Sequence, residues 1–277
     1  MRTTLAPDRL QEAFRALKAQ GRVGIIPFVT VGFPDVATTL ELAPALARAG
    51  ADVIELGVPF SDPLADGATI QKASFHALRQ GVTLSQCLRV CSTLRQNGLK
   101  TPLVLMGYYN PLLSFGLKHF AADARAAGVD GVIVADMPAE ESGPLHDECT
   151  PQGLHLICLL APTSTEARIA AACAAASGFI YCVSLAGVTG ARTRISPDVI
   201  RLVQRVRVHT GLPIAVGFGL SRREHVEAVG KYADAAIVGS ALLNVMESAP
   251  PGKVVDHASR FLADLRGAPQ SIARGMA

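Results

Sequence analysis

The sequence predicts a single-domain (β/α)8 barrel of the TIM-barrel class, spanning 1–277, with an extra N-terminal helix. Eight short, apolar, β-branched segments alternate with longer helical patterns along the 277 residues, which is typical of parallel βαβ units. The length is near that of a barrel of this class. No single Gly-rich dinucleotide fingerprint marks a first βα turn, which disfavours the open, doubly wound alternative.

The segment 1–22 has no apolar core of the kind a signal peptide requires. Leu10, Phe14 and Leu17 instead share one face of an amphipathic helix. No apolar run reaches the roughly 18–20 residues needed to cross a bilayer. We therefore expect a cytoplasmic protein that does not enter a membrane.

The predicted elements follow one another as strand and helix, with little between them. Predicted strands cover 24–31, 52–56, 103–106, 131–135, 155–160, 179–183, 214–216 and 235–238. Predicted helices cover 37–48, 70–80, 84–97, 118–127, 165–176, 197–209 and 222–229.

The loops on the two sides of these strands differ. Those before strands are short, as at 48–52 and 127–131, whereas those after strands are longer and rich in Gly, Pro and polar residues, notably 57–69, 107–116 and 185–196. Loops after the strands build the active site of a (β/α)8 barrel. The chemistry is therefore expected at that end.

Charge and cysteine content exclude several classes of function. The net charge of +3 gives no electrostatic case for nucleic acid or an anionic membrane. The six cysteines form no C-x-x-C pair and have no histidine at metal spacing. We expect free, buried thiols and no metal site.

Carboxylates gather around the end of the second predicted strand. Glu55 lies there among apolar neighbours, where it either points into the barrel mouth or needs a buried partner. Asp62 and Asp66 follow in a loop with Pro and Gly, where aspartate commonly forms turns. The residues alone leave a catalytic and a structural interpretation open.

Glycines follow the last three predicted strands. Gly190 ends the segment 187–190, Gly219 follows the seventh strand, and Gly239 with Ser240 follows the eighth, before a helical run. Barrel enzymes often bind phosphate at this place through backbone N–H groups and a helix N-terminus. Although each glycine alone is commonly a turn residue, together they predict a phosphate site.

Ordered motifs along most of the chain resemble the family of tryptophan synthase alpha subunits. The longest is IELGVPFSDPLADGATIQ at 54–71, which is more specific than any short pattern. Further similar segments are PFVTVGFPD (27–35), LMGYYNP (105–111), GVDGVIVADMPAEES (128–142), ICLLAPTST (157–165), YCVSLAGVTGAR (181–192), VGFGLS (216–221) and DAAIVGSAL (234–242).

The resemblance implies a lyase of tryptophan biosynthesis that cleaves indole-3-glycerol phosphate to indole and glyceraldehyde 3-phosphate. It implies that Glu55 and Asp66 are the catalytic acid–base pair. Glu55 would protonate indole C3 and later take the proton of the side-chain hydroxyl, while Asp66 would balance charge at the ring nitrogen. An apolar strand end would raise the pKa of Glu55, as a general acid near neutral pH requires.

The same resemblance assigns roles to three further residues. Tyr181 matches a position near the catalytic glutamate, although a simple core tyrosine is an equal alternative. Phe28 is similar to the aromatic residue that packs on the indole ring, although most strand phenylalanines are ordinary core residues. Thr189 matches the threonine of a mobile loop that hydrogen-bonds the loop aspartate, here Asp66, when the loop closes.

The resemblance also implies a partner. The segments around Asp62, Asn110 and Pro138 are similar to the family's surface for a beta subunit, which carries pyridoxal phosphate and completes an αββα complex. No cofactor is expected in this chain. Two departures, Ala68 where the family usually has Pro and Leu185 where a polar residue is common, remove no catalytic group but bear on loop stiffness and coupling to a partner.

Three alternatives stay open at this point. The first is a free-standing lyase that releases indole, and the second is a catalytically silent barrel that activates a beta partner. The third, an indole-glycerol phosphate synthase, would need catalytic lysines, and no lysine falls at a predicted strand end. Retention of Glu55, Asp66 and the glycines argues against the silent barrel.

Overall fold

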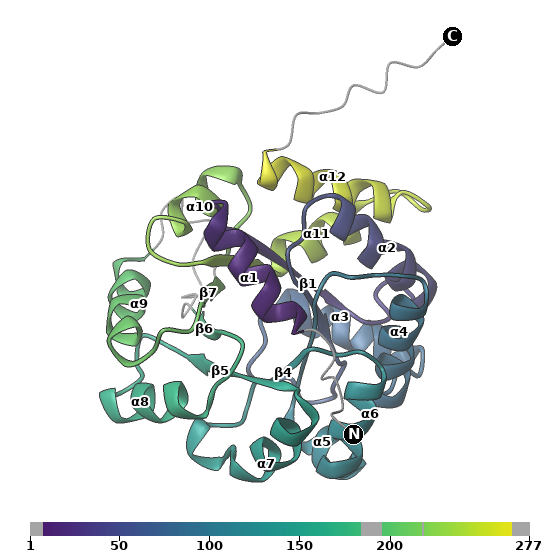
Figure 1. The fold of residues 1–277 in the computed structure, drawn as a ribbon. Coiled ribbons are helices and arrows are strands. Elements are labelled where there is room, and N and C mark those ends of the chain that lie inside the picture. The colour runs from purple at the N-terminus through teal and green to yellow at the C-terminus, as the bar shows by residue number, and fades with distance from the viewer. Residues whose placement is uncertain (1–7, 184–195, 218, 268–277) are drawn as a thin grey trace.

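The computed structural model describes residues 8–183, 196–217 and 219–267. Eight parallel strands form a closed barrel in which each strand pairs with the next and β8 pairs with β1 (Figure 1). This confirms the predicted (β/α)8 fold. The strands are β1 (Gly24–Thr30), β2 (Ile54–Gly57), β3 (Leu103–Gly107), β4 (Gly131–Val134), β5 (His155–Leu160), β6 (Ile180–Val183), β7 (Ile214–Gly217) and β8 (Ala235–Val238).

Helices surround the barrel, and most lie within two residues of their predicted bounds. Those in the described part of the chain are α1 (Arg9–Ala19), α2 (Val36–Arg48), α3 (Ala68–Arg79), α4 (Leu84–Gln96), α5 (Tyr109–Phe115), α6 (Leu117–Ala126), α7 (Gly143–Gln152), α8 (Glu166–Ala175), α9 (Pro197–His209), α10 (Arg223–Val229), α11 (Ser240–Ser248), α12 (Val254–Arg266) and the short 3-10 helix η1 (Ala139–Glu141).

Three of these helices, α5, α7 and α12, were not predicted. The segment 107–116 was expected as a loop, and this was wrong, because it contains the seven-residue helix α5. The cause is that α5 is short and has a proline in its first turn, so it shows no clear helical period. Pro151 similarly interrupts the pattern of α7.

Strand residues alternate between the barrel interior and the surrounding helices. In β1, Ile26 belongs to the inner apolar cluster, whereas Ile25 and Val29 belong to the outer one. In β2, Leu56 packs outward, so the alternation turns Glu55 inward. The alternation of strand residues is therefore enough to turn this carboxylate toward the barrel interior.

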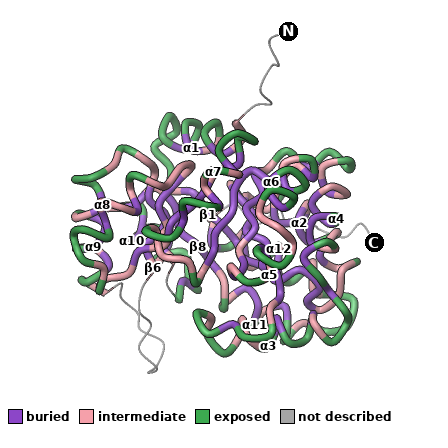
Figure 2. Tube along the Cα trace, turned by 90° about the horizontal axis from the view of Figure 1, so that it is seen from below, coloured by how far each residue is buried: buried purple, intermediate pink, exposed green. Residues whose placement is uncertain are grey.

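Helix α1 closes the N-terminal end of the barrel, as Figures 1 and 2 show. Its residues Leu10, Phe14 and Leu17 pack into the inner cluster, and the rings of Phe14 and Phe179 lie 5.6 Å apart. The backbone of β1 approaches closely, since a Cβ at Gly24 would lie 2.8 Å from Cδ1 of Leu17. The predicted extra helix thus covers the N-terminal end of the barrel.

Aspartates that precede three alternate strands tie this end together. Asp52 accepts a hydrogen bond from the N–H of Ile25, Asp130 from that of Leu103, and Asp234 from that of Ile214, at 2.7–2.8 Å. Each also pairs with arginine, through contacts from Arg22 and Arg266, from Arg9 and Arg95, and from Arg207 respectively. The sequence analysis placed Asp52 in the second strand. In the structure it precedes β2, and its side chain accepts a hydrogen bond from β1.

Two expectations about composition can be compared with the described residues. All six cysteines are free, and five are buried as expected, but Cys173 is only partly buried. Within the described ranges, no cluster of His, Cys, Asp or Glu is arranged to hold a metal ion. Among the helices that the structure describes, none is long and apolar enough to cross a membrane.

We predict that Asp130→Asn will lower the free energy of unfolding by about 3 kcal/mol, because it breaks a buried pair and leaves Arg95 uncompensated. Urea denaturation of the wild type and variant measures this. The matched control is Glu227→Gln, which breaks the exposed Arg223–Glu227 pair and should change stability by less than about 0.5 kcal/mol. Equal effects of the two variants would contradict a stabilising role for Asp130.

Candidate active site

A cavity of about 510 Å³ opens at the C-terminal ends of the strands. This is the end at which active sites of (β/α)8 barrels lie. Its lining combines apolar side chains with glycines and a few polar groups. The lining residues are Ala65, Asp66, Gly67, Ile70, Met106, Ala135, Leu159, Tyr181, Val183, Gly217, Gly219, Leu220, Ile237, Gly239, Ser240 and Ala241.

Glu55 lies in β2 with its side chain turned into the barrel and is 1% exposed. Neither carboxylate oxygen has a hydrogen-bond partner among the described residues. Burial, with the nearby charge of Asp66, raises the pKa of Glu55 to about 8. A structural ion pair, the alternative interpretation from sequence, is absent among the described residues.

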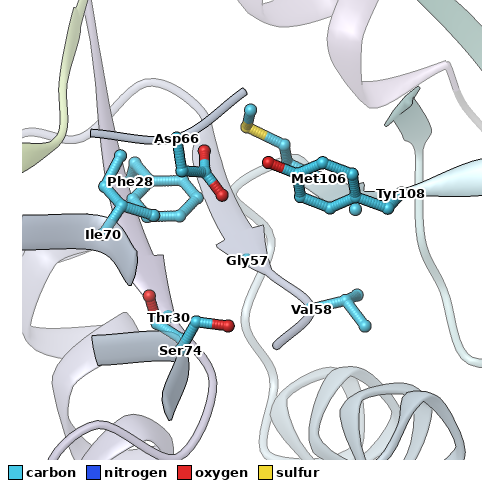
Figure 3. A pocket seen from close by; sticks show the side chains of 10 residues that line it. Phe28, Thr30, Gly57, Val58, Asp66, Ile70, Ser74, Met106 and Tyr108 are labelled. Carbon is cyan, nitrogen blue, oxygen red and sulfur yellow. The ribbon is translucent and has the colours of Figure 1, made fainter. Parts of the chain in front are cut away.

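Asp66 follows β2 in the loop that leads to α3. Its backbone N–H donates to the carbonyl of Pro63 at 3.0 Å, and Nε2 of Gln71 donates to the carbonyl of Asp66 at 2.9 Å. Burial raises the pKa of its carboxyl group to about 6, and a hydrogen bond from the hydroxyl of Tyr108 opposes this shift. Asp66 and Tyr108 face each other across a common space in Figure 3.

Tyr108 was missed by the sequence analysis, although it lies in the LMGYYNP motif. Its hydroxyl accepts a hydrogen bond from the N–H of Ala65 at 3.1 Å, and its ring lies 5.1 Å from that of Phe60. The same hydroxyl lies near the carboxyl group of Asp66 and lowers the pKa of that group. Tyr108 therefore attaches the loop after β2 to the end of β3. Its place just after a strand was the available signal.

Tyr181 and Phe28 occupy the barrel mouth, and each lies over a glycine. A Cβ at Gly217 would lie 2.3 Å from the hydroxyl of Tyr181, and one at Gly57 would lie 2.5 Å from Cζ of Phe28. Burial, Glu55 and Asp66 together raise the pKa of Tyr181 well above its usual value. Tyr181 thus lies close enough to Glu55 and Asp66 for their charges to act on its hydroxyl. The sequence analysis gave neither glycine this role, because a glycine that gives space to a neighbour resembles a turn glycine in sequence.

Three of the predicted phosphate residues, Gly219, Gly239 and Ser240, line this one cavity. Gly239 and Ser240 begin α11, whose first N–H groups have no partner within the helix. Gly219 lines the same cavity, and a Cβ at this position would have no atom of the described residues within 4 Å. The helix N-terminus therefore offers an anion site beside open space. Thr189 and Gly190 lie outside the described residues.

The three residues assigned to a partner surface follow three neighbouring strands. Asp62 lies after β2, Asn110 lies in α5 after β3, and Pro138 precedes η1 after β4. Asp62 and Asn110 are exposed, and Pro138 is partly buried. Because β2, β3 and β4 are adjacent, all three residues lie on one side of the barrel mouth.

The geometry indicates acid–base chemistry on a ligand with an apolar body and an anionic end. Near pH 7, Glu55 retains its proton and Asp66 is mainly ionised, because their pKa values lie near 8 and 6. Two carboxyl groups held on opposite sides of neutrality are the pattern of an acid–base pair. Ile70, Leu159 and Ile237 give the cavity apolar walls between this pair and α11.

Comparison with known proteins gives one consistent result. The sequence model of the family described as "Tryptophan synthase alpha chain" matches residues 14–266. The tryptophan synthase alpha chain of Roseiflexus castenholzii is 51% identical over 260 residues, covering 94% of this chain and all of that protein.

Solved structures agree with the sequence match. Tryptophan synthase subunit alpha from Legionella pneumophila superposes with a TM-score of 0.87 at 34% identity, covering 95% of this chain and 98% of the other. A structure from Pyrococcus furiosus, titled for mutual activation of the tryptophan synthase α2β2 complex, has a TM-score of 0.83 at 37% identity and covers 88% of this chain and 98% of the other. Since the match covers nearly the whole chain in both sequence and structure, this chain belongs to the tryptophan synthase alpha chain family.

Proposed function

We propose that the barrel cleaves indole-3-glycerol phosphate to indole and glyceraldehyde 3-phosphate, with Glu55 and Asp66 as its acid–base pair. Membership of the alpha chain family supports the reaction, which is that of a carbon–carbon lyase. The single observation that carries the residue assignment is the buried, unpartnered carboxyl group of Glu55 beside Asp66 at the strand ends. Incubation of the purified protein with indole-3-glycerol phosphate, followed by detection of indole, tests the proposal.

The reaction begins with a proton from Glu55. The neutral carboxylic acid of Glu55 donates its proton to indole C3, and the resulting positive charge spreads to the ring nitrogen. Asp66, as a carboxylate, balances this charge or accepts the ring N–H proton. An aromatic carbon is a poor leaving group, so this protonation makes cleavage of the bond between C3 and the side chain possible.

The second half of the reaction restores both groups. When the carbon–carbon bond breaks, its electron pair returns to C3 and the indole ring regains aromaticity. The Glu55 carboxylate takes the proton of the adjacent side-chain hydroxyl as the aldehyde forms. Glu55 thereby regains its proton, and Asp66 returns to the ring nitrogen any proton that it accepted, so both groups end as they began and no external acid or base is consumed.

The remaining lining residues hold the substrate. The N-terminus of α11, with Gly239 and Ser240, binds the phosphate through backbone N–H groups, and Gly219 leaves room for it. Phe28 contributes its ring to the indole end of the site, and Tyr181 orients the carboxyl group of Glu55. Thr189 and Gly190 are assigned to loop closure and phosphate binding on the family resemblance.

We further propose that this cytoplasmic enzyme binds a beta subunit in an αββα complex. Alpha chains of this family carry no cofactor of their own, and pyridoxal phosphate belongs to the beta subunit. Asp62, Asn110 and Pro138 lie on one side of the mouth, and the same loops expose Leu64 (90%) and Leu113 (54%). Exposed apolar side chains near an active site are typical of a protein interface.

We predict that Glu55→Gln will lower kcat by roughly 10²–10⁴-fold and leave the fold intact, because the amide can neither donate the proton nor recover it. Indole release measures the rate, and urea denaturation checks the fold. The wild-type kcat/KM should follow a bell-shaped pH profile. It should fall as pH drops through about 6, where Asp66 gains a proton, and as pH rises through about 8, where Glu55 loses its own.

The decline of the profile above about pH 8 provides a control for the assignment of Glu55 as the proton donor. A Glu55→Gln protein has no titrating group at this position, so its residual activity should lose the decline near pH 8. Retention of wild-type turnover in this variant would show that another residue supplies the proton.

We predict that Gly219→Val will raise KM for indole-3-glycerol phosphate with little change in stability. In the part of the chain that the structure describes, no atom lies within 4 Å of a Cβ at this position, so the main effect should be on the bound phosphate. Gly211→Val is the matched control, because Gly211 also has open space but lies at the other end of β7. An equal rise in KM for both variants, or for a dephosphorylated analogue, would contradict the phosphate assignment.

We predict that a cognate beta subunit will raise the rate of indole formation and that Leu113→Glu or Asn110→Asp will weaken this response more than basal activity. A charge buried at the interface costs binding energy, and binding there biases the loop that carries Asp66. Val208→Glu is the control, since Val208 is 82% exposed on the distant helix α9. A fast rate without the beta subunit, unchanged by its addition, would favour a free-standing lyase.

A further inference from the structure

A second buried polar group in the barrel mouth has no role in the mechanism above. Thr30 ends β1 with its inward side chain 2% exposed, and its hydroxyl oxygen has no hydrogen-bond partner among the described residues. An unsatisfied buried hydroxyl costs free energy, so its persistence needs an explanation.

Thr30 is one of the residues that line a small cavity beneath the loop after β2. This cavity has a volume of about 10 Å³ and is lined by Thr30, Asp66, Ser74 and Tyr108 together with apolar residues and glycines. Figure 3 shows the hydroxyls of Thr30 and Ser74 on one side and Asp66 with Tyr108 on the other. The volume is that of about one water molecule.

The other hydroxyls at this cavity are already engaged. Ser74 Oγ donates to the carbonyl of Phe60 at 3.1 Å and accepts from its N–H at 2.9 Å. The Tyr108 hydroxyl accepts from the N–H of Ala65 and lies near enough to Asp66 to lower the pKa of its carboxyl group. The unused donor is therefore Thr30, and the acceptor with remaining capacity is the carboxylate of Asp66.

We propose that this cavity binds one structural water that accepts a hydrogen bond from Thr30 and donates one to Asp66, which makes Thr30 a positioning residue for that carboxylate. The remaining lone pair of Ser74 gives the water a third partner, within the two to four that buried waters typically use. The inference rests on the proposed role of Asp66.

The water would act on both the geometry and the charge of Asp66. Together with Tyr108, it would hold the carboxylate from two directions and leave its open side toward the ligand cavity. A hydrogen bond to the ionised form also lowers a carboxyl pKa, against the burial that raises it. The titratable groups that face Asp66 are Glu55 from β2, Tyr108 from the end of β3 and Tyr181 from β6.

The test replaces Thr30 by Val, which has nearly the same shape but no hydroxyl, and by Ser, which keeps the hydroxyl. Thr30→Val should lower kcat near pH 7 roughly tenfold and move the acid limb of the kcat/KM profile upward by about one pH unit. Thr30→Ser should restore most of both. A high-resolution crystal structure should show a water between Thr30 and Asp66 in the wild type and none in Thr30→Val.

Thr39→Val is the matched control. Thr39 is also buried, but its hydroxyl accepts from the N–H of Gly32 at 3.1 Å and donates to the carbonyl of Asp35 at 3.0 Å. This variant should lose stability without moving the acid limb. A similar shift in both variants would assign the effect to general destabilisation and overturn the proposal.

Asp66→Asn separates failure of this inference from failure of the mechanism. If Asp66→Asn is inactive while Thr30→Val keeps the wild-type rate and pH profile, the water site is wrong and the role of Asp66 stands. If Asp66→Asn is fully active, both the mechanism and the inference are overturned. Loss of activity in Thr30→Ser equal to that in Thr30→Val would also contradict a role for the hydroxyl.

Discussion

The site depends on a carboxyl group that is buried in the barrel without a partner. Transfer of Glu55 into apolar surroundings disfavours its ionised form and raises its pKa to about 8. The nearby carboxylate of Asp66 raises the pKa of Glu55 further. Tyr108 lowers the pKa of Asp66 and so opposes the effect of burial on that group. The difference between the two environments gives one fold a proton donor and a charge-balancing base at the same pH.

The two ends of the barrel treat polar groups in opposite ways. At the N-terminal end, Asp52, Asp130 and Asp234 satisfy strand N–H groups and pair with arginines, while α1 fills the opening with apolar side chains. At the C-terminal end, Glu55 and Thr30 keep unsatisfied oxygens in the described structure. The paired polar groups at the N-terminal end contribute to stability. The C-terminal end, where we propose that the ligand binds, contains unpaired groups that cost free energy.

Space in the mouth is set by pairs of large and small residues. Gly57 allows the ring of Phe28 to lie over β2, and Gly217 allows that of Tyr181 to lie over β7. Any larger residue at either glycine would clash with the aromatic ring over it. The layer that holds the two carboxyl groups therefore also limits the volume of the cavity at the strand ends.

The sequence by itself determined the fold class, the order of the elements and the identity of the carboxylates. Alternating apolar residues define the strands, and the same period turns Glu55 inward, so these features depend on neighbours that are close in the chain. The family resemblance then supplied the reaction and the pairing of Glu55 with Asp66. Only the tertiary structure decided that Tyr108 holds Asp66, that glycines make room for the rings, and that Thr30 is left without a partner, because each depends on contacts between strands and loops far apart in sequence. The pKa values of the two carboxyl groups also could be determined only from the tertiary structure, because burial is a property of the closed barrel and not of any segment.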